Sequence, residues 1–287
     1  MRLSGKVALI TGAGRHKGLG EAIARQFAGE GAHVVITDIG KPSGPMLSAD
    51  NIGTAAEMDS VAEGIRAHAE AAGSAANVVT LTCDVRDEED IKRAIGETVK
   101  QFGKLDIVVN NAGIGYIMKP LTEFSIEEWD LILDVNLRGP FLMTKHAAAQ
   151  MMRQHQAGGS KGGRIINIAS RGAKSATAHL VAYTSSKHGL VGLTRVAAVE
   201  LGAHGITVNA VCPNHVTTGL GAKQNAHRGK VLGTDLAGVL AFRTSRIPLG
   251  RVGLAEDTAH ACAFLASDEA AYITGEAMNV SGGEEMH

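Results

Sequence analysis

Aromatic residues are scarce in this chain. They make up 3% of 287 residues, with one Trp and three Tyr, so aliphatic side chains must build the core of a sequence that is 45% apolar. An excess of charge is missing as well, since 28 Lys and Arg stand against 29 Asp and Glu. General binding to nucleic acid or to an anionic membrane depends on a basic excess, and we expect neither partner.

Cysteine is equally sparse. Cys83, Cys212 and Cys262 are odd in number, far apart and without a C-x-x-C pair. This pattern supplies neither a disulfide framework nor a zinc site, so we expect no metal ligands and a reducing compartment. The N-terminus lacks the apolar stretch of a signal peptide, and no apolar run approaches the roughly 20 residues that span a bilayer. The sequence therefore predicts a soluble, cytoplasmic protein.

Short aliphatic runs without polar alternation recur between helical patterns, as in a parallel sheet covered on both faces. The expected strands are Val7–Ile10, Val34–Thr37, Val78–Thr82, Ile107–Asn110, Ile165–Ile168, Ile206–Val211 and Ala277–Val280. Helical patterns cover Gly20–Glu30 and Thr184–Leu201. We expect one doubly wound α/β domain of Rossmann type over residues 1–287, with a seven-stranded parallel sheet flanked by helices.

Two segments exceed the minimal plan of such a fold. Residues 40–76 form an insert after the second strand, on the side where an adenosine would bind, with one helix expected around 55–72. Residues 215–248 follow a strand end, are polar and have no strand pattern. Long segments of this kind are often lids, and we expect 215–248 to cover a substrate. The glycine-rich run 158–163 precedes a strand and is interpreted as a surface turn.

The 36 glycines cluster at one informative place, the turn after the first strand, where Thr11 to Gly20 reads TGAGRHKGLG. Glycine there lets backbone N–H groups approach a pyrophosphate, and the N-terminus of the following helix favours negative charge. Asp38 ends the next strand, eighteen residues after Gly20. Its carboxylate can accept hydrogen bonds from ribose hydroxyls and would repel a 2′-phosphate. The pattern predicts a dinucleotide site that favours NAD over NADP.

Further motifs follow in a fixed order: Cys83-Asp84-Val85, Asn110-Asn111-Ala112-Gly113 and Tyr183-Thr184-Ser185-Ser186-Lys187. With the Thr11-Gly12 turn, they make the chain resemble a short-chain dehydrogenase/reductase from Lys6 to Gly283. The resemblance implies that Asp84 contacts adenine and that the segment from Asn110 to Gly113 supports the central strand beside the nucleotide. It implies cofactor contacts at Gly12, Gly14, Arg15, Gly18, Leu19, Gly20, Asp38, Asp84, Val85, Asn110, Ala112, Gly113, Tyr183, Lys187, Pro213, Val216 and Thr218.

The glycine turn departs from the family pattern T-G-x-x-x-G-x-G, because five residues separate Gly12 from Gly18. Either two residues are inserted after Gly12, or Gly14, Gly18 and Gly20 form the phosphate turn. The strand register favours the insertion, which brings residues 15–17 (Arg-His-Lys) near the phosphates. A solvated basic bulge is the alternative, and these basic residues keep NADP open as a rival cofactor.

Tyr183 and Lys187 are four residues apart at the start of a helix and hence share one face. A nearby ammonium lowers the pKa of a tyrosine from about 10, which makes its hydroxyl a usable general acid and base. Ser170 follows the strand Ile165–Ile168 at the ligand-binding edge of the sheet. By resemblance, Ser170 holds the substrate oxygen, Tyr183 moves the proton, Lys187 also holds the nicotinamide ribose, and Asn136 supports a water-linked proton relay.

The segment from Pro213 to Thr218 resembles the family pattern Pro-Gly-x-Val/Ile-x-Thr, with Asn214 in place of glycine. Asparagine tolerates the positive φ that such a turn can require. The resemblance implies that the Val216 backbone and the Thr218 hydroxyl hold the nicotinamide carboxamide.

The 215–248 segment is basic, which would suit an anionic substrate or form a solvated face. Its charged residues are Lys223, Arg228, Lys230, Arg243 and Arg246 against Asp235, and Arg171 and Lys174 follow Ser170. We expect an NAD-dependent oxidoreductase that interconverts a secondary alcohol and a ketone. The alternatives are an NADPH-dependent 3-oxoacyl-carrier-protein-type reductase and a catalytically inactive nucleotide-binding protein. Family resemblance also implies a homotetramer or homodimer.

Overall fold

The computed structural model of the protein describes residues 1–158, 162–216 and 218–286. Within that part of the chain, seven parallel strands form one sheet in the order β3-β2-β1-β4-β5-β6-β7. The strands are β1 (Val7–Thr11), β2 (His33–Asp38), β3 (Val78–Thr82), β4 (Ile107–Asn110), β5 (Gly163–Ile168), β6 (Ile206–Pro213) and β7 (Ala277–Val280). The predicted fold class is confirmed, and the observed strands exceed the expected runs by no more than two residues at either end.

Strand order reverses between β1 and β4, which pair with each other although β2 and β3 lie between them in the sequence. At such a reversal, the connections from the two strands leave in opposite directions, and a crevice opens at their carboxyl ends. The turn after β1 and the segment after β4 both lie at this edge, so the fold brings together two of the motifs that the sequence singled out.

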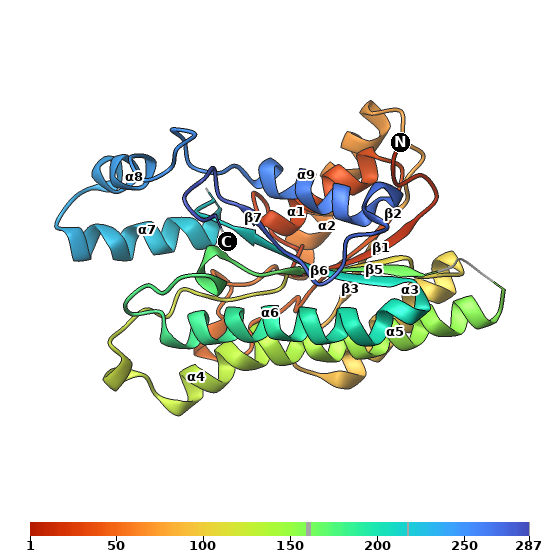
Figure 1. Ribbon diagram of the computed structural model, residues 1–287, viewed down its shortest axis with the longest axis horizontal. Helices are drawn as coiled ribbons and strands as arrows, with labels where there is room; N and C mark the ends of the chain where they lie inside the picture. Colours follow the sequence, from red (N-terminus) through yellow and green to blue (C-terminus); the bar gives the residue numbers. More distant parts are fainter. Residues whose placement is uncertain (159–161, 217, 287) are drawn as a thin grey trace.

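Helices cover both faces of the sheet (Figure 1). One face carries α1 (Leu19–Gly29), α2 (Ala55–Ala71) and α9 (Ala255–Ala266). The other carries α3 (Glu88–Phe102), α5 (Gly139–Gln156) and α6 (Val181–Leu201), with the short α4 (Ile126–Leu133) against α6. None of the described helices is both long enough and apolar enough to cross a membrane.

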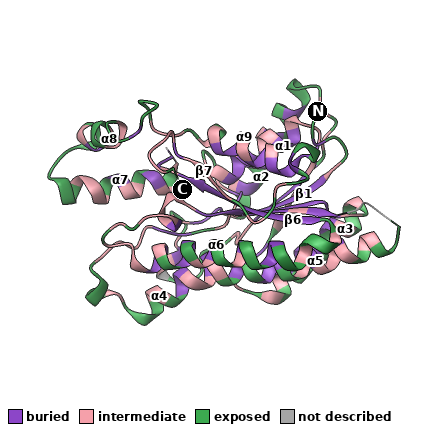
Figure 2. Cartoon of the chain, viewed as in Figure 1, coloured by how far each residue is buried: buried purple, intermediate pink, exposed green. Residues whose placement is uncertain are grey.

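Alternate residues of the central strands enter separate cores on the two faces, which explains why these strands read as unbroken apolar runs. Ile10 of β1 packs with Phe27 and Ile65 on one face, whereas Leu9 packs with Ile95 and Met143 on the other. Aliphatic side chains dominate both cores, as the low aromatic content requires. Figure 2 shows the buried residues concentrated in the sheet and on the inward sides of the helices.

The two additional segments begin at the carboxyl edge of the sheet, after β2 and after β6. In the 40–76 insert, Gly40 forms an isolated parallel bridge with Thr54, and Thr54 caps the N-terminus of α2. The 215–248 segment is largely helical, with α7 (Gly219–Leu232) and α8 (Leu236–Thr244) projecting beyond one end of the sheet (Figure 1). Residues 159–161 of the expected glycine-rich turn at 158–163 lie outside the described residues.

Candidate active site

A long cavity runs along the carboxyl ends of the strands, from the ends of β3 and β2 to the end of β6. Most of the residues predicted from the sequence line it. They are Gly12, Arg15, Gly18, Leu19, Asp38, Asp84, Val85, Ala112, Gly113, Ser170, Tyr183, Lys187, Pro213, Val216 and Thr218. Gly14, Gly20, Asn110 and Asn136 are not among the lining residues. Gly14 and Asn136 instead bond to lining residues, since Gly14 donates to Asp38 and Asn136 bonds to Ile114.

The glycine turn has no room for side chains at its two ends. A Cβ on Gly12, whose φ is +63°, would lie 2.6 Å from the Cα of Ala112. A Cβ on Gly20 would lie 2.7 Å from both the Cα of Ala13 and the Nδ2 of Asn111. The two glycines therefore let the turn pack directly on the segment after β4. Gly18 and Leu19, at the start of α1, line the cavity, and the N-terminus of a helix favours negative charge there.

The extra residues of the turn fold into a small loop of their own. The N–H of Gly18 bonds the carbonyl of Arg15 at 3.3 Å, and Gly18 then caps α1. Arg15 and His16 line the long cavity, while the His16 ring also contacts the Ser60 hydroxyl. Lys17 has a positive φ of 56° and donates its N–H to Glu21. Of the three basic residues, Arg15 and His16 thus line the cavity and Lys17 does not.

Asp38 lies where β2 ends, as predicted, and its carboxylate accepts three backbone hydrogen bonds. Oδ2 accepts from Gly14 at 3.1 Å, and Oδ1 accepts from Ile39 at 2.9 Å and Gly53 at 3.1 Å. Burial raises the pKa of this carboxyl, and the three N–H donors act in the opposite direction. A carboxylate has roughly four acceptor sites, so capacity remains for a ligand hydroxyl. The glycine turn and the Asp38 carboxylate together fit a dinucleotide.

Two other predicted residues have partners that the sequence did not indicate. Asp84 forms an ion pair with Arg86, with 2.9 Å between Nε and Oδ1, and both residues line the cavity. Asn110 is buried and donates from Nδ2 to Asn167 at 2.8 Å. The neighbouring Asn111 holds the glycine turn, because its Nδ2 donates to the carbonyls of Thr11 and Gly12, each at 2.9 Å.

Tyr183 and Lys187 lie one turn apart on α6, and both are almost fully buried. The Nζ of Lys187 donates to the carbonyl of Ile168 at 2.7 Å and lies 5.8 Å from the centroid of the Tyr183 ring. Burial lowers the pKa of Lys187 to about 8. It raises the pKa of Tyr183, although a hydrogen bond with Ser170 acts against this. The expected lowering of the tyrosine pKa is therefore absent, because burial outweighs the stabilising contacts.

Asn136 is completely buried in a π-helical turn, Asp134–Arg138, which continues α4. Its Oδ1 accepts from the N–H of Ile114 and its Nδ2 donates to the carbonyl of Ile114, both at 2.8 Å. The same Nδ2 donates to the Ser186 hydroxyl on α6 at 3.1 Å. Asn136 thus fixes the segment after β4 against the helix that carries Tyr183 and Lys187.

A second cavity, here called the side cavity, shares Ser170 and Tyr183 with the long cavity. Its other walls come from the loop after Ser170, from α7 and α8, and from the C-terminal segment. The basic residues that line it are Arg171, Arg228, Arg243 and Arg246. Of the remaining basic residues predicted for the lid, Lys223 bonds Asn51 of the insert, and Lys230 is exposed.

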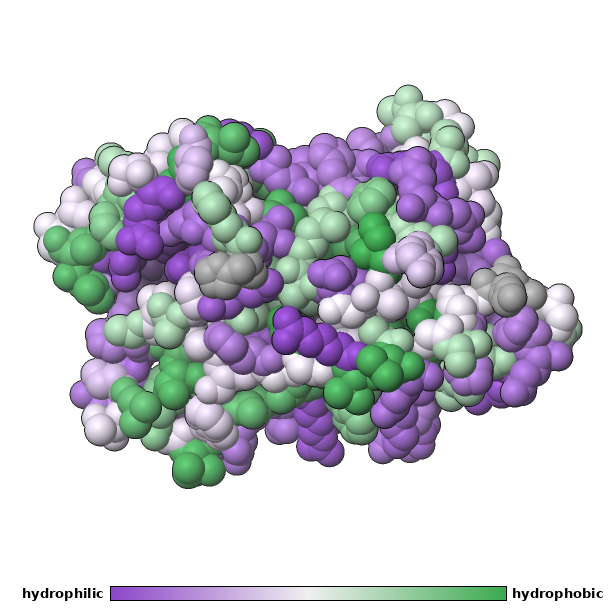
Figure 3. Space-filling model, in the orientation of Figure 1, coloured by the Kyte–Doolittle hydropathy of each residue, from purple (hydrophilic) through white to green (hydrophobic). Residues whose placement is uncertain are grey.

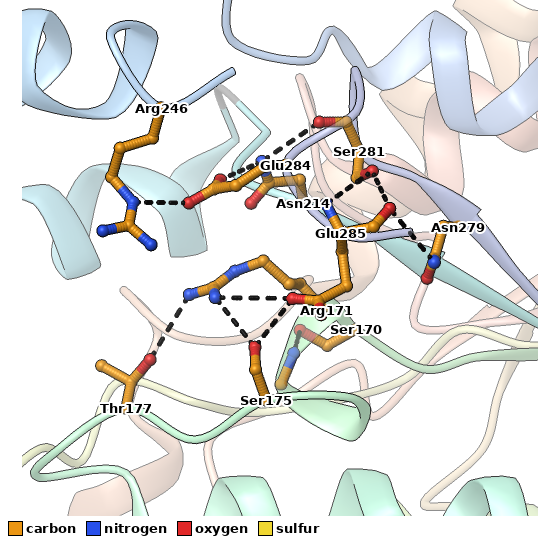
Figure 4. A network of polar contacts seen from close by, with 11 residues as sticks. Ser170, Arg171, Ser175, Thr177, Asn214, Arg246, Asn279, Ser281, Glu284 and Glu285 are labelled. Atoms are coloured by element: carbon orange, nitrogen blue, oxygen red, sulfur yellow. Dashed lines mark hydrogen bonds and ion pairs between the residues drawn. The ribbon is translucent and has the colours of Figure 1, made fainter. Parts of the chain in front are cut away.

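The C-terminal segment brings two acids that sequence reasoning missed. Glu284 pairs with Arg246, and Glu285 lies 3.9 Å from Arg171 and accepts from Ser175 (Figure 4). Asn214 also donates to Glu284, at 2.5 Å. No sequence signal pointed to these acids, because they lie more than thirty residues beyond the lid.

The loop after β6 differs from the expectation in one respect. Among the described non-glycine residues, positive φ occurs at Lys17 and His179 and not at Asn214. The loop therefore accepts asparagine without left-handed backbone. Its neighbour His215 is 5% exposed, and its Nε2 has no hydrogen-bond partner within the described residues. Burial and the nearby Arg243 lower the pKa of His215 to about 4.

Comparisons with known proteins agree with this geometry. Residues 48–285 match a family model described as enoyl-(acyl carrier protein) reductase. A short-chain dehydrogenase/reductase of Armillaria gallica is 39% identical over 280 residues, covering 97% of this chain and 95% of that protein. (+)-Borneol dehydrogenase 2 of Salvia officinalis is 37% identical over 287 residues, covering 99% and 90%. Carveol dehydrogenase from Mycobacterium avium, solved in complex with NAD, is 32% identical with a TM-score of 0.86, covering 99% and 98%.

A switch-point cavity that joins a glycine turn to Ser170, Tyr183 and Lys187 defines the class of dinucleotide-dependent oxidoreductases. Within that class, the chain belongs to the short-chain dehydrogenase/reductase family. It is an enzyme of the short-chain alcohol dehydrogenase and ketoreductase type, which acts on CH–OH groups.

Proposed function

We propose that the protein interconverts a secondary alcohol and a ketone with NAD as its cofactor. The observation that carries this proposal is the position of Ser170 and Tyr183 in the walls of both cavities. A substrate oxygen at that junction would reach both hydroxyls. The long cavity would hold the dinucleotide, and the side cavity would hold the remainder of the substrate.

When bound, the nicotinamide supplies the hydride acceptor for oxidation or the hydride donor for reduction. In reduction, the Ser170 hydroxyl donates a hydrogen bond to the ketone oxygen and stabilises the negative charge that develops there. The Oη of Tyr183 delivers its proton to the same oxygen, and it takes that proton back in oxidation. The raised pKa of Tyr183 keeps it protonated at neutral pH, as the reducing direction needs.

The other site residues have supporting roles in this proposal. Lys187 stabilises the phenolate left on Tyr183 and holds the nicotinamide ribose. Val216 and Thr218 hold the nicotinamide carboxamide, and Asp84 and Val85 contact the adenine. Asn136 holds α6 in position against the segment after β4. The segment 215–248 acts as the substrate lid of what we take to be a single catalytic domain.

A Tyr183→Phe variant tests the proton-transfer role directly, with Tyr272→Phe as the matched control because Tyr272 is fully exposed. Loss of one positioned acid–base group lowers kcat by about 100-fold to 10,000-fold. We expect that loss in Tyr183→Phe with NAD binding retained, measured by NADH absorbance and by calorimetry. Turnover at the wild-type rate in Tyr183→Phe would refute the assignment. No turnover of any alcohol by the wild-type protein would favour a catalytically inactive nucleotide-binding protein.

The choice of NAD rests on Asp38, whose fixed carboxylate would face a 2′-phosphate with like charge. The NAD complex of the related carveol dehydrogenase supports the same choice. We expect a preference for NAD over NADP in kcat/KM, and we expect Asp38→Ser to reduce that preference by at least about tenfold. A wild-type enzyme that prefers NADP would overturn the role of Asp38.

A 3-oxoacyl-acyl-carrier-protein reductase is a second candidate, because the 3-oxoacyl-[acyl-carrier-protein] reductase of Thermotoga maritima is 35% identical to this chain over 283 residues. Turnover of a 3-oxoacyl thioester with NADPH, faster than that of any free ketone, would favour this alternative over the NAD-dependent enzyme.

Assembly and location belong to the same proposal. The helices α5 and α6 expose Phe141, Val196 and Val199, which would suit an interface in a homodimer or homotetramer. Light scattering of the purified protein measures that state. Cys83, Cys212 and Cys262 are free and buried, in keeping with a cytoplasmic enzyme.

A further inference from the structure

The side cavity carries more arginine than its own acids neutralise. Four guanidinium groups line it, at Arg171, Arg228, Arg243 and Arg246, together with Glu284. Strongly hydrophilic side chains gather around a hollow beside α7 and α8 in Figure 3. Because Ser170 and Tyr183 line the same cavity, its charge acts on whatever substrate approaches them.

Two of the four arginines are paired with the C-terminal segment, as Figure 4 shows. The Nε of Arg246 lies 3.0 Å from Glu284 Oε1. Arg171 lies 3.9 Å from Glu285 Oε2 and donates to the Ser175 hydroxyl at 2.9 Å. These charges are balanced within the protein.

Arg228 and Arg243 are not balanced in this way. Arg243 donates from Nε to the amide oxygen of Asn225 at 3.0 Å, and the Arg228 guanidinium lies 5.1 Å from the Phe242 ring centroid. Within the described residues, neither has a carboxylate at ion-pair distance. Asp235, the acid of this segment, instead caps α8 by accepting from Gly238 at 2.9 Å.

The two unpaired guanidinium groups also repel each other. Burial, reinforced by the charges of Arg228 and Arg171, lowers the pKa of Arg243 to about 10, although the charge of Glu284 acts in the opposite direction. A half-buried arginine that lacks a counterion destabilises the folded protein, and an anion between the two groups would relieve this. Guanidinium groups bind carboxylate and phosphate oxygens in a bidentate manner, which suits such a ligand.

We propose that the substrate is a secondary alcohol, or its ketone, that also carries a carboxylate or phosphate group, bound by Arg228 and Arg243. This inference rests on the proposed function, since it places the reacting oxygen at Ser170 and Tyr183 and the anion farther along the same cavity. It also separates this enzyme from dehydrogenases of uncharged terpene alcohols.

The first test compares matched substrates with the full-length enzyme and NAD. Straight-chain secondary hydroxycarboxylates of increasing length are measured against their methyl esters, and secondary alcohol phosphates against the corresponding diols. Hydrogen bonds to charged groups are strong enough to make kcat/KM at least about tenfold higher for the anionic member of the best pair, and added salt reduces that ratio. Esters or diols that react as well as their anionic partners overturn the inference and leave the proposed function intact.

Anion binding can be measured without turnover. With NAD bound, inorganic phosphate should raise the Tm of the wild-type protein more than that of Arg243→Gln, because a ligand that binds the native state stabilises it and the general effect of phosphate on stability is common to both proteins. An equal rise in the two proteins counts against the site. If the wild-type protein shows the larger rise while no alcohol reacts, the anion site stands and the proposed function fails.

Variants assign the effect to particular residues. Arg228→Gln and Arg243→Gln should each lower the ratio of kcat/KM for acid over ester by about tenfold or more, mainly through a higher KM for the acid. The matched control is Lys230→Gln, which removes the same charge from an exposed position of α7 and should keep the wild-type ratio. If Lys230→Gln and Arg228→Gln lower the ratio equally, the preference for the acid comes from the overall positive charge of the lid, and the proposed site is overturned.

Discussion

Asn136 donates a 3.1 Å hydrogen bond from Nδ2 to the Oγ of Ser186, which joins a π-helical turn to the helix that carries Tyr183 and Lys187. The side chain also satisfies both backbone groups of Ile114. Its replacement therefore leaves a buried donor and a buried acceptor unsatisfied, in addition to breaking the contact with α6.

We expect Asn136→Ala to lower the free energy of unfolding by about 2–4 kcal/mol, because unsatisfied buried groups are more destabilising than the loss of an exposed hydrogen bond. Urea unfolding measures this. Because Asn136 positions other residues, kcat should fall at least about tenfold while the KM for NAD changes little. Ser186→Ala, the control, removes the contact with α6 and spares Ile114. Equal destabilisation in the two variants would contradict the role given to the Ile114 bonds.

The buried Lys187 predicts a pH dependence of ketone reduction. Its pKa is lowered to about 8, and that of Tyr183 is raised, so both groups are protonated in the neutral range. As pH rises through about 8, Lys187 loses the charge that stabilises a developing phenolate, and kcat/KM should decline. A pH–rate profile with NADH measures this decline. Arginine keeps its charge at such pH values, so the activity that remains in Lys187→Arg should not decline near pH 8. If kcat/KM of Lys187→Arg still declines there, the decline comes from the titration of another group.

Two Gly→Ala substitutions, one in the glycine turn and one in α3, are expected to change stability in opposite directions. In Gly20→Ala, the new Cβ would lie 2.7 Å from the Ala13 backbone, so the turn must shift. Overpacking of this kind lowers stability by about 1–3 kcal/mol, and NAD affinity should fall about tenfold or more. The control, Gly96→Ala in α3, meets no atom within 4 Å and should stabilise the protein by about 0.5–1 kcal/mol. Urea unfolding and calorimetry with NAD compare them. Unchanged NAD affinity in Gly20→Ala would contradict the role of the glycine turn in binding the dinucleotide.

Patterns that depend on backbone periodicity were predictable from the sequence. Buried parallel strands leave unbroken aliphatic runs, and parallel pairing brings their carboxyl ends to one edge, so Asp38, Ser170 and the segment after Asn110 could be placed together. The spacing of Tyr183 and Lys187 fixed their common face on α6. These features follow from residue spacing and from the regular geometry of helices and parallel sheets.

Contacts between distant segments were not predictable. The pairing of Glu284 with Arg246 depends on where the C-terminal segment crosses the site, and nothing local encodes that path. Likewise, the pKa of Tyr183 reflects burial by the surrounding elements, which a spacing of four residues does not reveal. The basic excess of the lid was therefore visible in the sequence, whereas the distinction between balanced and unbalanced arginines required the structure.

His215 predicts a loss of stability in acid. Its pKa is lowered to about 4 in the folded protein, whereas an unfolded chain has an ordinary histidine near pH 6.5. The unfolded state therefore binds the proton first, so the contribution of His215 is fully present above about pH 6.5 and is lost as pH falls towards 4. Between pH 7 and pH 4.5 this amounts to roughly 2 kcal/mol. His215→Leu cannot take up the proton, so acid should reduce its free energy of unfolding by about that much less than it reduces that of the wild type. Urea unfolding at both pH values measures this.

The control is His260→Leu, which removes an exposed histidine and should respond to acid as the wild type does. If His215→Leu is destabilised by acid as strongly as His260→Leu, the buried imidazole is not the group that titrates.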